Sequence, residues 1–427
     1  MNEEIARSVR GDLEDQLGRY GCALILGPRQ VGKTFLARQL ARHSADAAVL
    51  LDLQAADDRK QVKDFRRFHE ANAGKLIILD EAQEAPELFP ELRACLDRRE
   101  FESDNTQWLL LGSAAAQLTQ LAGQLGGRYG EINLWPFQIG ELTSNLATSS
   151  APADIGDVVA QTAAQSPTSE HHDIQHKIWL RGGFPDSYLA ATEEVSLEWR
   201  SSYLRSLTDP AFIPNGVLER PELVKPMWEH LALNQGEPML LDKAAQRLGC
   251  KVSVVRELLA HLRMTRLVRD LRPWFPNEGK RVDKPPRYFI RDSGLLHENW
   301  KFTAIDELRA NPLCGKSWEG FVLEALSVRK PNSAKLYFYR NDKQQEIDII
   351  MDFGADRRWA IEVKLGNDTA PEAGFYDAVA EVAAERAFVI NGGPESIDPG
   401  NEKVQILCLA DALALFPQPE RGQTVKR

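Results

Sequence analysis

The feature that most constrains the fold of this chain is the run GPRQVGKT at residues 27–34, which has the spacing GxxxxGK[ST]. An apolar stretch at residues 23–26 precedes the run, and the helix-like stretch TFLARQLARH begins at its last residue. A glycine-rich loop between a strand and a helix turns backbone N–H groups toward bound phosphates, and the helix N-terminus adds a favourable dipole. The run therefore predicts a nucleotide-phosphate site on a parallel α/β sheet, with a plain glycine turn as the alternative.

All eight residues of the run are expected to contact the nucleotide, and two of them have particular roles. Lys33 should reach the β- and γ-phosphates of ATP, and the Thr34 hydroxyl should ligate Mg²⁺. ATP and Mg²⁺ are therefore the expected cofactors, and ATP hydrolysis is the expected reaction. The predicted nucleotide-binding residues are Gly27, Pro28, Arg29, Gln30, Val31, Gly32, Lys33 and Thr34.

A second apolar stretch, LIILDE at residues 76–81, ends in two carboxylates. Asp80 suits the outer coordination shell of the Mg²⁺ ion, and Glu81 is placed to polarise the attacking water. An acidic pair at the end of a strand is common in proteins. Behind a phosphate-binding loop, however, this pair predicts a hydrolytic site.

Two further residues are candidates for catalysis. Ser113 follows the apolar run WLLLG and should face the γ-phosphate, unless it only caps the helix that follows. Arg128 lies in the glycine-rich turn GGRY, where it could act as an arginine finger on the ATP of a neighbouring subunit. A solvated arginine is the alternative for Arg128.

These stretches together resemble the AAA-type P-loop ATPases of prokaryotes that carry a characteristic C-terminal domain of unknown function. The resemblance rests on GPRQVGKT, LIILDEAQ, LAGQLGGRYGEINLWPFQIGEL, WLRGGFPDSYLA, KRVDKPPRYFIRDSGLL and EIDIIMD with WAIEVKLG, and it omits only residues 143–173. It implies that Lys33, Thr34, Asp80 and Glu81 are the nucleotide residues. The chain departs from the group at residues 114–116, which are alanines where relatives carry more serines.

The middle of the chain is basic, since residues 241–291 contain 13 Lys and Arg but only 5 Asp and Glu. Their pattern is helix, glycine turn, helix and two strands with a tip at Gly279, which resembles a winged helix. Such a module lays its second helix in the major groove of DNA. A solvated basic face or a protein-docking surface is the alternative. The residues expected to face bases are Lys251, Ser253 and Arg256, and those expected to reach the DNA backbone are Lys280, Arg281 and Lys284.

Carboxylates in the last third of the chain resemble the PD-(D/E)xK nuclease pattern. Glu319 lies on an expected helix, Asp348 on a strand, and Glu362 with Lys364 on the next strand. Two carboxylates can hold Mg²⁺ while the lysine orients a water. The alternatives are a cross-strand ion pair, or a nuclease-like fold that binds without cutting. Ile347 stands where the pattern's name has proline.

Composition limits the class of protein. A net charge of -10 argues against a basic coat protein for nucleic acids. The five cysteines lie far apart, which predicts a reducing compartment and neither a disulfide framework nor a cysteine zinc site. His171, His172 and His176 are expected in a solvated loop without a metal. The start of the chain lacks a signal peptide and no run of 18 apolar residues occurs, so a cytoplasmic protein without membrane spans is expected.

The expected architecture is α/β with five parts. The hypothesis that covers them best is an ATP-hydrolysing, DNA-associated protein whose ATPase cycle controls the winged helix and the nuclease-like region. The alternative is a nucleotide-gated scaffold that binds a protein partner, and a homo-oligomer is possible in either case. The expected parts are an AAA-type P-loop ATPase domain at 1–142, a linker or insertion at 143–173, a helical lid-like region at 174–230, a winged helix at 231–300 and a restriction-endonuclease-like domain at 301–427.

Overall fold

The computed structural model describes most of the chain and divides it into two compact units. Among the described residues, the first unit contains those up to 136 together with 264–266, and the second contains 137–263 and those from 267 to 415. No helix in the described part of the chain has the length and apolar character needed to cross a membrane. The described residues are 5–43, 48–102, 104–112, 115–143, 169–209, 213, 218–275, 284–366, 370–397 and 404–415.

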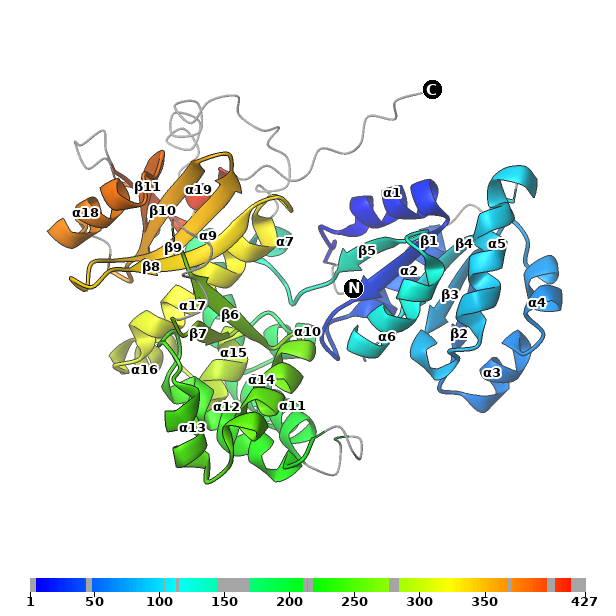
Figure 1. Ribbon diagram of the computed structural model, residues 1–427, viewed down its shortest axis with the longest axis horizontal. Helices are drawn as coiled ribbons and strands as arrows, with labels where there is room; N and C mark the ends of the chain where they lie inside the picture. The colour runs from blue at the N-terminus through cyan, green and yellow to red at the C-terminus, as the bar shows by residue number, and fades with distance from the viewer. Residues whose placement is uncertain are drawn as a thin grey trace. The chain divides into compact units, whose positions relative to one another are not determined.

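The first unit is a five-stranded parallel sheet with the strand order β2-β3-β4-β1-β5 and helices on both faces (Figure 1). Its central strands β1, β3 and β4 are apolar except for Asp80 at the end of β3 and Gln107 at the start of β4, as is usual where helices cover both faces of a parallel sheet. The strands are β1 Cys22–Leu26, β2 Val49–Asp52, β3 Leu76–Asp80, β4 Gln107–Leu111 and β5 Gly130–Asn133. The helices are α1 Arg10–Tyr20, α2 Lys33–His43, α3 Ala56–Val62, α4 Phe65–Ala71, α5 Leu88–Glu102 and α6 Ala115–Ala122, with short 3₁₀ turns η1 Ala82–Glu84 and η2 Gly123–Leu125.

The register of this sheet decides where a ligand can bind. Ile25 of β1 pairs with Leu111 of β4, and Leu79 of β3 pairs with Leu110, so the strands end together at one edge. The loop at residues 27–32 and the turn at Glu81 both follow from that edge. Ligands of open parallel sheets bind outside the carboxyl ends of the strands, so the fold puts the predicted phosphate site in the expected place.

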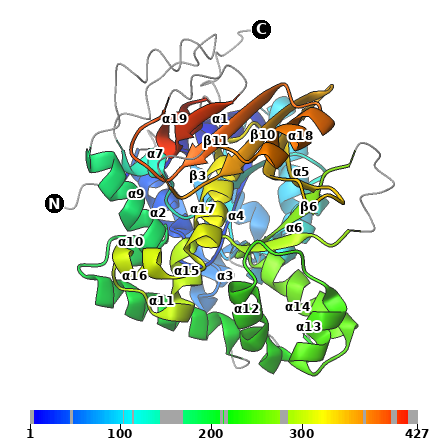
Figure 2. The same ribbon diagram turned by 90° about the vertical axis from the view of Figure 1, so that its left-hand side faces the viewer.

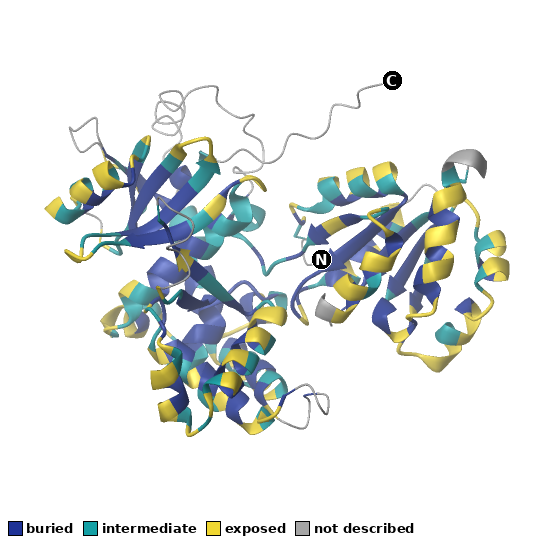
Figure 3. Ribbon diagram, viewed as in Figure 1, coloured by how far each residue is buried: buried dark blue, intermediate teal, exposed yellow. Residues whose placement is uncertain are grey.

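The second unit is built on a seven-stranded mixed sheet with the order β12-β11-β10-β9-β8-β6-β7 (Figure 1), and Figure 2 shows β10 and β11 side by side in it. The central strands β9 and β10 pair antiparallel and are buried along most of their length, as the dark blue strands in Figure 3 show. The strands are β6 Val268–Pro273, β7 Arg287–Ile290, β8 Lys335–Arg340, β9 Glu346–Gly354, β10 Arg357–Val363, β11 Arg386–Asn391 and β12 Gln405–Cys408.

Helices of the second unit pack around a buried arginine. Arg200 is fully buried, and its guanidinium donates to the carbonyl oxygens of Leu180, Gly294 and Phe302, so one side chain ties α9, α11 and the segment around α15 together. The helices are α7 Ile139–Leu142, α9 Ser169–Arg181, α10 Pro185–Tyr188, α11 Glu193–Thr208, α12 Val224–Leu233, α13 Leu241–Leu248, α14 Val252–Met264, α15 Ser293–His297, α16 Ile305–Ala310, α17 Cys314–Arg329, α18 Ala373–Glu381 and α19 Leu409–Ala414, with 3₁₀ turns η4 Pro221–Leu223 and η6 Glu298–Trp300.

The predicted α/β class and the parallel sheet of the first unit are confirmed. Strand β6 pairs in parallel with β8 through Arg272 and Tyr337, so residues on both sides of the expected boundary at 300/301 share one sheet. The five-part division stays a prediction. Of the expected linker, residues 144–168 lie outside the described part of the chain, and residues 169–173 belong to α9.

Candidate nucleotide site and acidic centre

The loop between β1 and α2 has the backbone geometry that its glycines allow. Gly32 has φ 98° and Gln30 has φ 57°, so both lie in the left-handed region, where glycine has no steric cost. A Cβ atom at Gly27 would lie 2.3 Å from the carbonyl oxygen of Leu134. Close approach to Leu134 therefore requires glycine at position 27, and the turn at Gly32 favours it.

Lys33, the first residue of α2, is folded over this loop. Its Nζ donates to the carbonyl oxygens of Gly27 at 3.0 Å and Pro28 at 2.8 Å, and the residue is 7% exposed. Burial lowers the pKa of Lys33 to about 8, although the nearby carboxylates of Glu81 and Asp80 act in the opposite direction. The ammonium group of Lys33 therefore already lies against the backbone of the phosphate-binding loop.

The predicted Mg²⁺ ligands meet at the same place. The Thr34 hydroxyl donates to Asp80 Oδ2 at 2.5 Å, and Asp80 Oδ1 accepts from the backbone N–H of Glu81 at 3.0 Å. Burial raises the pKa of Asp80, while the hydrogen bond from Thr34 lowers it in part. A hydroxyl and a carboxylate side by side are oxygen ligands of the kind that Mg²⁺ prefers.

Glu81 has an unusual backbone conformation, and its side chain lies beside that of Gln83. Its φ is 51°, and its Oε2 accepts from Gln83 Nε2 at 2.6 Å. Non-glycine residues in the left-handed region are uncommon and cluster at functional sites. Gln83 Oε1 is buried and has no hydrogen-bond partner among the described residues, and it lies close to Gly112. The sequence pattern predicted no role for Gln83, although Gln83 is the last residue of the run LIILDEAQ.

A cation that the sequence pattern did not single out also belongs to the first unit. Arg266 has φ 63° and donates to Asn133 Oδ1, and its guanidinium lies 5.5 Å from the Trp135 ring. Its charge adds to burial and Arg29 in lowering the pKa of Lys33. The sequence places Arg266 only in the basic middle region at residues 241–291.

The two other catalytic candidates remain predictions. Ser113 lies outside the described residues. Arg128 forms an ion pair with Asp97 and donates to the carbonyl oxygen of Gly126 at 3.3 Å. To reach a neighbouring nucleotide, Arg128 would have to leave Asp97.

The basic face of α14 has the predicted orientation. Lys251, just before the helix, and Ser253 and Arg256 within it are exposed, while Val255 and Leu258 on the opposite side are buried. Lys284 is exposed and lies 3.8 Å from Asp342, whereas Lys280 and Arg281 fall outside the described residues. Three of the six residues predicted to contact nucleic acid therefore share one exposed helix end.

The four predicted nuclease-like residues come together from three elements. Glu319 lies on α17, Asp348 on β9 and Glu362 on β10, and each is less than 9% exposed. Asp348 Oδ2 accepts from the backbone N–H of Val363 at 3.0 Å, and Lys364 Nζ lies 2.8 Å from Glu362 Oε1. We call Glu319, Asp348 and Glu362 the acidic centre.

A buried arginine that carried no individual prediction lies within the acidic centre. Arg287 of β7 is 2% exposed, and its Nη1 lies 3.5 Å from Glu319 Oε1 and 3.9 Å from Asp348 Oδ1. Its Nη2 donates to Glu346 at 2.8 Å. Lys316 adds a second cation, with Nζ 3.0 Å from Glu319 Oε2. The acidic centre therefore contains its own positive charge.

The carboxyl groups of the centre hold protons more tightly than free carboxylates. Burial, with the charge of Asp348, raises the pKa of Glu319 to about 7 and that of Glu362 to about 7. Burial also raises the pKa of Asp348. Within the described part of the chain, these three side chains do not form a group in which one oxygen from each lies within 4.8 Å of the other two. As described, the centre is not arranged as a three-carboxylate metal cage.

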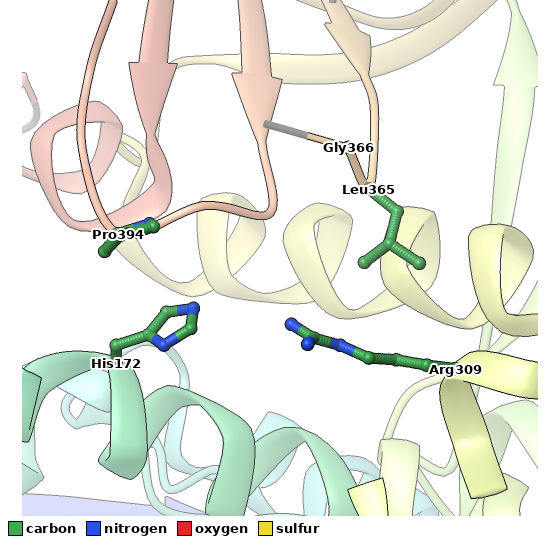
Figure 4. A pocket seen from close by; sticks show the side chains of 5 residues that line it. All are labelled: His172, Arg309, Leu365, Gly366 and Pro394. Carbon is green, nitrogen blue, oxygen red and sulfur yellow. The ribbon is translucent and has the colours of Figure 1, made fainter. Parts of the chain in front are cut away.

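A cavity of about 450 Å³ lies elsewhere in the second unit, lined by His172, Arg309, Leu365, Gly366 and Pro394 (Figure 4). Arg309 Nη2 lies 2.9 Å from His176 Nε2, and burial lowers the pKa of His176 to about 4. The prediction of a solvated loop for the histidines is wrong, since His172 and His176 lie half-buried on α9.

Comparison with known proteins identifies the class of the first unit. Residues 20–143 match the family described as AAA domain, so the chain carries an AAA-type ATPase domain, as the resemblance implied. Residues 172–306 and 314–410 match two domains of unknown function, DUF8612 and DUF4143. Among solved structures, the Walker-type ATPase of Pyrococcus abyssi is 16% identical, with 70% of this chain and 96% of that one covered at a TM-score of 0.46. The Aeropyrum pernix ORC1 protein, solved in complex with DNA, is 13% identical, with 70% and 93% covered at a TM-score of 0.31.

Two mycobacterial proteins define the family itself. The uncharacterized protein Rv2008c of Mycobacterium tuberculosis is 30% identical over 392 residues, which cover 91% of this chain and 80% of that protein. Mb2031c of Mycobacterium bovis matches to the same extent. The chain belongs to the family of these two proteins.

Proposed function

We propose that the first unit binds Mg-ATP and hydrolyses its γ-phosphate bond. The contact between the Thr34 hydroxyl and Asp80 is the observation that carries the proposal, because it joins the end of the phosphate loop to the end of β3. In this mechanism Lys33 leaves the loop carbonyls to bind the β- and γ-phosphates, Thr34 ligates Mg²⁺, and Asp80 holds its outer shell. Glu81, oriented by Gln83, accepts a proton from the attacking water or aligns it.

Two substitutions test these roles. Lys33→Ala should abolish nucleotide binding, measured with a fluorescent ATP analogue. Glu81→Gln should keep binding but reduce turnover by at least about 100-fold, because a general base contributes that much or more. Glu84→Gln is the matched control, since Glu84 is an exposed carboxylate three residues away and should leave turnover unchanged. A parent rate in Glu81→Gln would show that this assignment is wrong.

We further propose that the second unit associates with DNA through α14. Support comes from the element order, in which α12, α13 and α14 precede the antiparallel pair β6 and β7, the order of a winged helix. The exposed Lys251, Ser253 and Arg256 would then face the groove, and Lys284 would reach the DNA backbone, the role also predicted for Lys280 and Arg281 outside the described residues. The competing proposal is that the same face docks a protein.

The salt dependence of DNA affinity distinguishes DNA binding from protein docking at this face. Neutralising Lys251, Arg256, Lys280 and Arg281 together should weaken binding and reduce the slope of log K against log salt by up to about 0.9 per lost phosphate contact. Binding would be followed by fluorescence anisotropy of a labelled duplex. A control variant neutralises four basic residues elsewhere in the second unit, all of them exposed: Lys301, Lys335, Lys343 and Arg357. An unchanged slope in the first variant would favour protein docking.

For the acidic centre we propose a binding or structural role rather than phosphodiester cleavage. The Arg287 guanidinium supplies positive charge between Glu319 and Asp348, where a nuclease would use a metal ion, and Lys364 is engaged by Glu362. This favours the nucleotide-gated binding protein over an ATP-controlled nuclease. The parent should cleave neither DNA nor RNA in Mg²⁺ or Mn²⁺, with or without ATP. Cleavage that Asp348→Ala or Lys364→Ala abolishes, with ATPase activity intact, would overturn this proposal.

A further inference from the structure

The first unit contains a cluster of three potential metal ligands away from the nucleotide site. His69 lies on α4, Cys95 on α5, and Asp104 in the segment before β4. Cys95 Sγ lies 3.4 Å from His69 Nε2, His69 Nε2 lies 3.0 Å from Asp104 Oδ2, and Cys95 Sγ lies 4.0 Å from Asp104 Oδ2. Among the described residues, this is the one group of His, Cys, Asp and Glu side chains whose ligand atoms all lie within 4.8 Å of one another.

These separations fit one face of a tetrahedral zinc site. Zinc lies about 2.3 Å from a thiolate and about 2.0–2.2 Å from imidazole nitrogen or carboxylate oxygen, so neighbouring ligand atoms are about 3.3–3.6 Å apart. The three measured distances bracket that range. Nitrogen, sulfur and oxygen donors in one cluster favour a borderline-soft ion such as Zn²⁺ over Mg²⁺ or Ca²⁺.

Hydrogen bonds orient Asp104, and ring stacking orients His69. Asp104 Oδ1 accepts from the backbone N–H of Thr106 at 2.9 Å and from its hydroxyl at 2.6 Å, which leaves Oδ2 directed at His69. The imidazole of His69 stacks on Phe65 and on Trp108, with interplanar angles of 7° and 24°. Ligand carboxylates that are themselves hydrogen-bonded are typical of metal sites.

We propose that His69, Cys95 and Asp104 bind one divalent transition-metal ion of the zinc class, with the fourth position open to water or a small ligand. On binding, the thiol proton of Cys95 passes to solvent, and the ring proton of His69 is carried by Nδ1, so that Nε2 ligates the metal as a neutral imidazole in place of its hydrogen bond with Asp104. The imidazole must also turn, because Cys95 Sγ lies 3.7 Å from Nδ1, nearly as close as to Nε2. That rotation changes the stacking of His69 on Trp108.

The position of the cluster assigns it a role separate from ATP hydrolysis. Trp108 is the second residue of β4 and pairs with Cys22 at the start of β1, so the cluster lies toward the amino ends of the strands. The phosphate loop and Glu81 follow the carboxyl ends. A metal here would tie α4, α5 and the entry to β4 together, and would stabilise the first unit without contacting the nucleotide.

Metal titration of the full chain tests the proposal. After treatment with a chelator, Co²⁺ should bind with a stoichiometry of one and produce a thiolate charge-transfer absorption, and Zn²⁺ should displace it. Cys95→Ser should lose that absorption, and His69→Gln and Asp104→Asn should each bind Zn²⁺ at least about 10-fold more weakly. Cys250→Ser and His43→Gln are the controls, since they change a thiol and an imidazole that lie outside the cluster.

The outcomes are distinct. Absence of the charge-transfer absorption in the parent, or its persistence in Cys95→Ser, would overturn the proposal and leave the cluster as a hydrogen-bonded group without a metal. Nucleotide binding by each variant reports whether the first unit is folded. If Cys95→Ser fails to fold, Asp104→Asn decides, because it keeps the shape of the side chain and removes only the charge.

Discussion

Replacing Arg287 with methionine should destabilise the second unit in a way that depends on pH. Arg287 is 2% exposed and lies within ion-pair distance of Glu319, Glu346 and Asp348. Methionine keeps much of the volume and the contact with the Phe338 ring, which lies 4.4 Å from the guanidinium carbon. The substitution therefore removes mainly the positive charge, and leaves the buried Glu319 with Lys316 as its remaining ion-pair partner among the described residues.

The expected cost at pH 8 is about 3–5 kcal/mol, the range for removing one partner of a buried ion pair. The sign of the pH dependence follows from the raised carboxyl pKa values. In the parent, burial raises the pKa values of Glu319 and Glu362 to about 7, above the ordinary value for a glutamate, so their protonation stabilises the folded state and that contribution is lost as the pH rises from about 4.5 to about 7. Without Arg287, whose charge lowers the pKa of Glu319 and that of Asp348, these two pKa values rise further. The cost should therefore be smaller at pH 5 than at pH 8.

Hydrogen exchange of peptides from β9 and β10, read by mass spectrometry, measures the opening free energy where the change is made. Arg340→Met is the matched control, because Arg340 lies 3.8 Å from Glu346 but its side chain is 39% exposed, and it should cost no more than about 1 kcal/mol. Mg²⁺ should protect Arg287→Met and not the parent. A cost below about 1 kcal/mol at pH 8, or one equal at both pH values, would refute the view that Arg287 neutralises the acidic centre.

Gly27→Ala should weaken nucleotide binding and destabilise the first unit by about 1–3 kcal/mol, because the added Cβ would lie 2.3 Å from the Leu134 carbonyl oxygen. Gly123→Ala is the control, since a Cβ at Gly123 would meet open space. Equal melting temperatures for the two variants would contradict the prediction. Thr34→Ala should abolish the Mg²⁺ dependence of ATP binding while Thr34→Ser keeps it, and a calorimetric titration with and without Mg²⁺ would show this. Gln83→Leu should lower kcat with little change in KM, because it removes the group that orients Glu81 and leaves the phosphate contacts in place. Steady-state kinetics in which only KM changes would contradict this role of Gln83.

Local patterns predicted that Thr34 and Asp80 would meet, because both residues follow directly from strand ends. The spacing around Lys33 and Thr34 describes one continuous loop, and the parallel sheet brings Asp80 to it from 46 residues away. The carboxyl ends of parallel strands share an edge, so a sequence that predicts the strands also predicts that meeting.

Other residues could not be found this way. Arg287 reaches the acidic centre only because β7 joins the same sheet through β6, a pairing with no periodic signal. His69, Cys95 and Asp104 come from two helices and a loop, so the absence of a CxxC pair hid their proximity. The role of Gln83 depends on the left-handed turn at Glu81, which residue type does not reveal.

The pairing of β6 with β8 also decides where the chain can be cut. A fragment that began at residue 301 would lose the partner strand along Tyr337 and Phe338 and expose backbone N–H and C=O groups on β8. It would lose Arg287 as well, and would keep Glu319, Asp348 and Glu362 with one fewer compensating charge. Such a fragment should aggregate, whereas one that begins upstream of β6 retains both the edge strand and the counter-ion. The residues that look most like a separable enzyme domain therefore depend for their folding on a hairpin encoded before them.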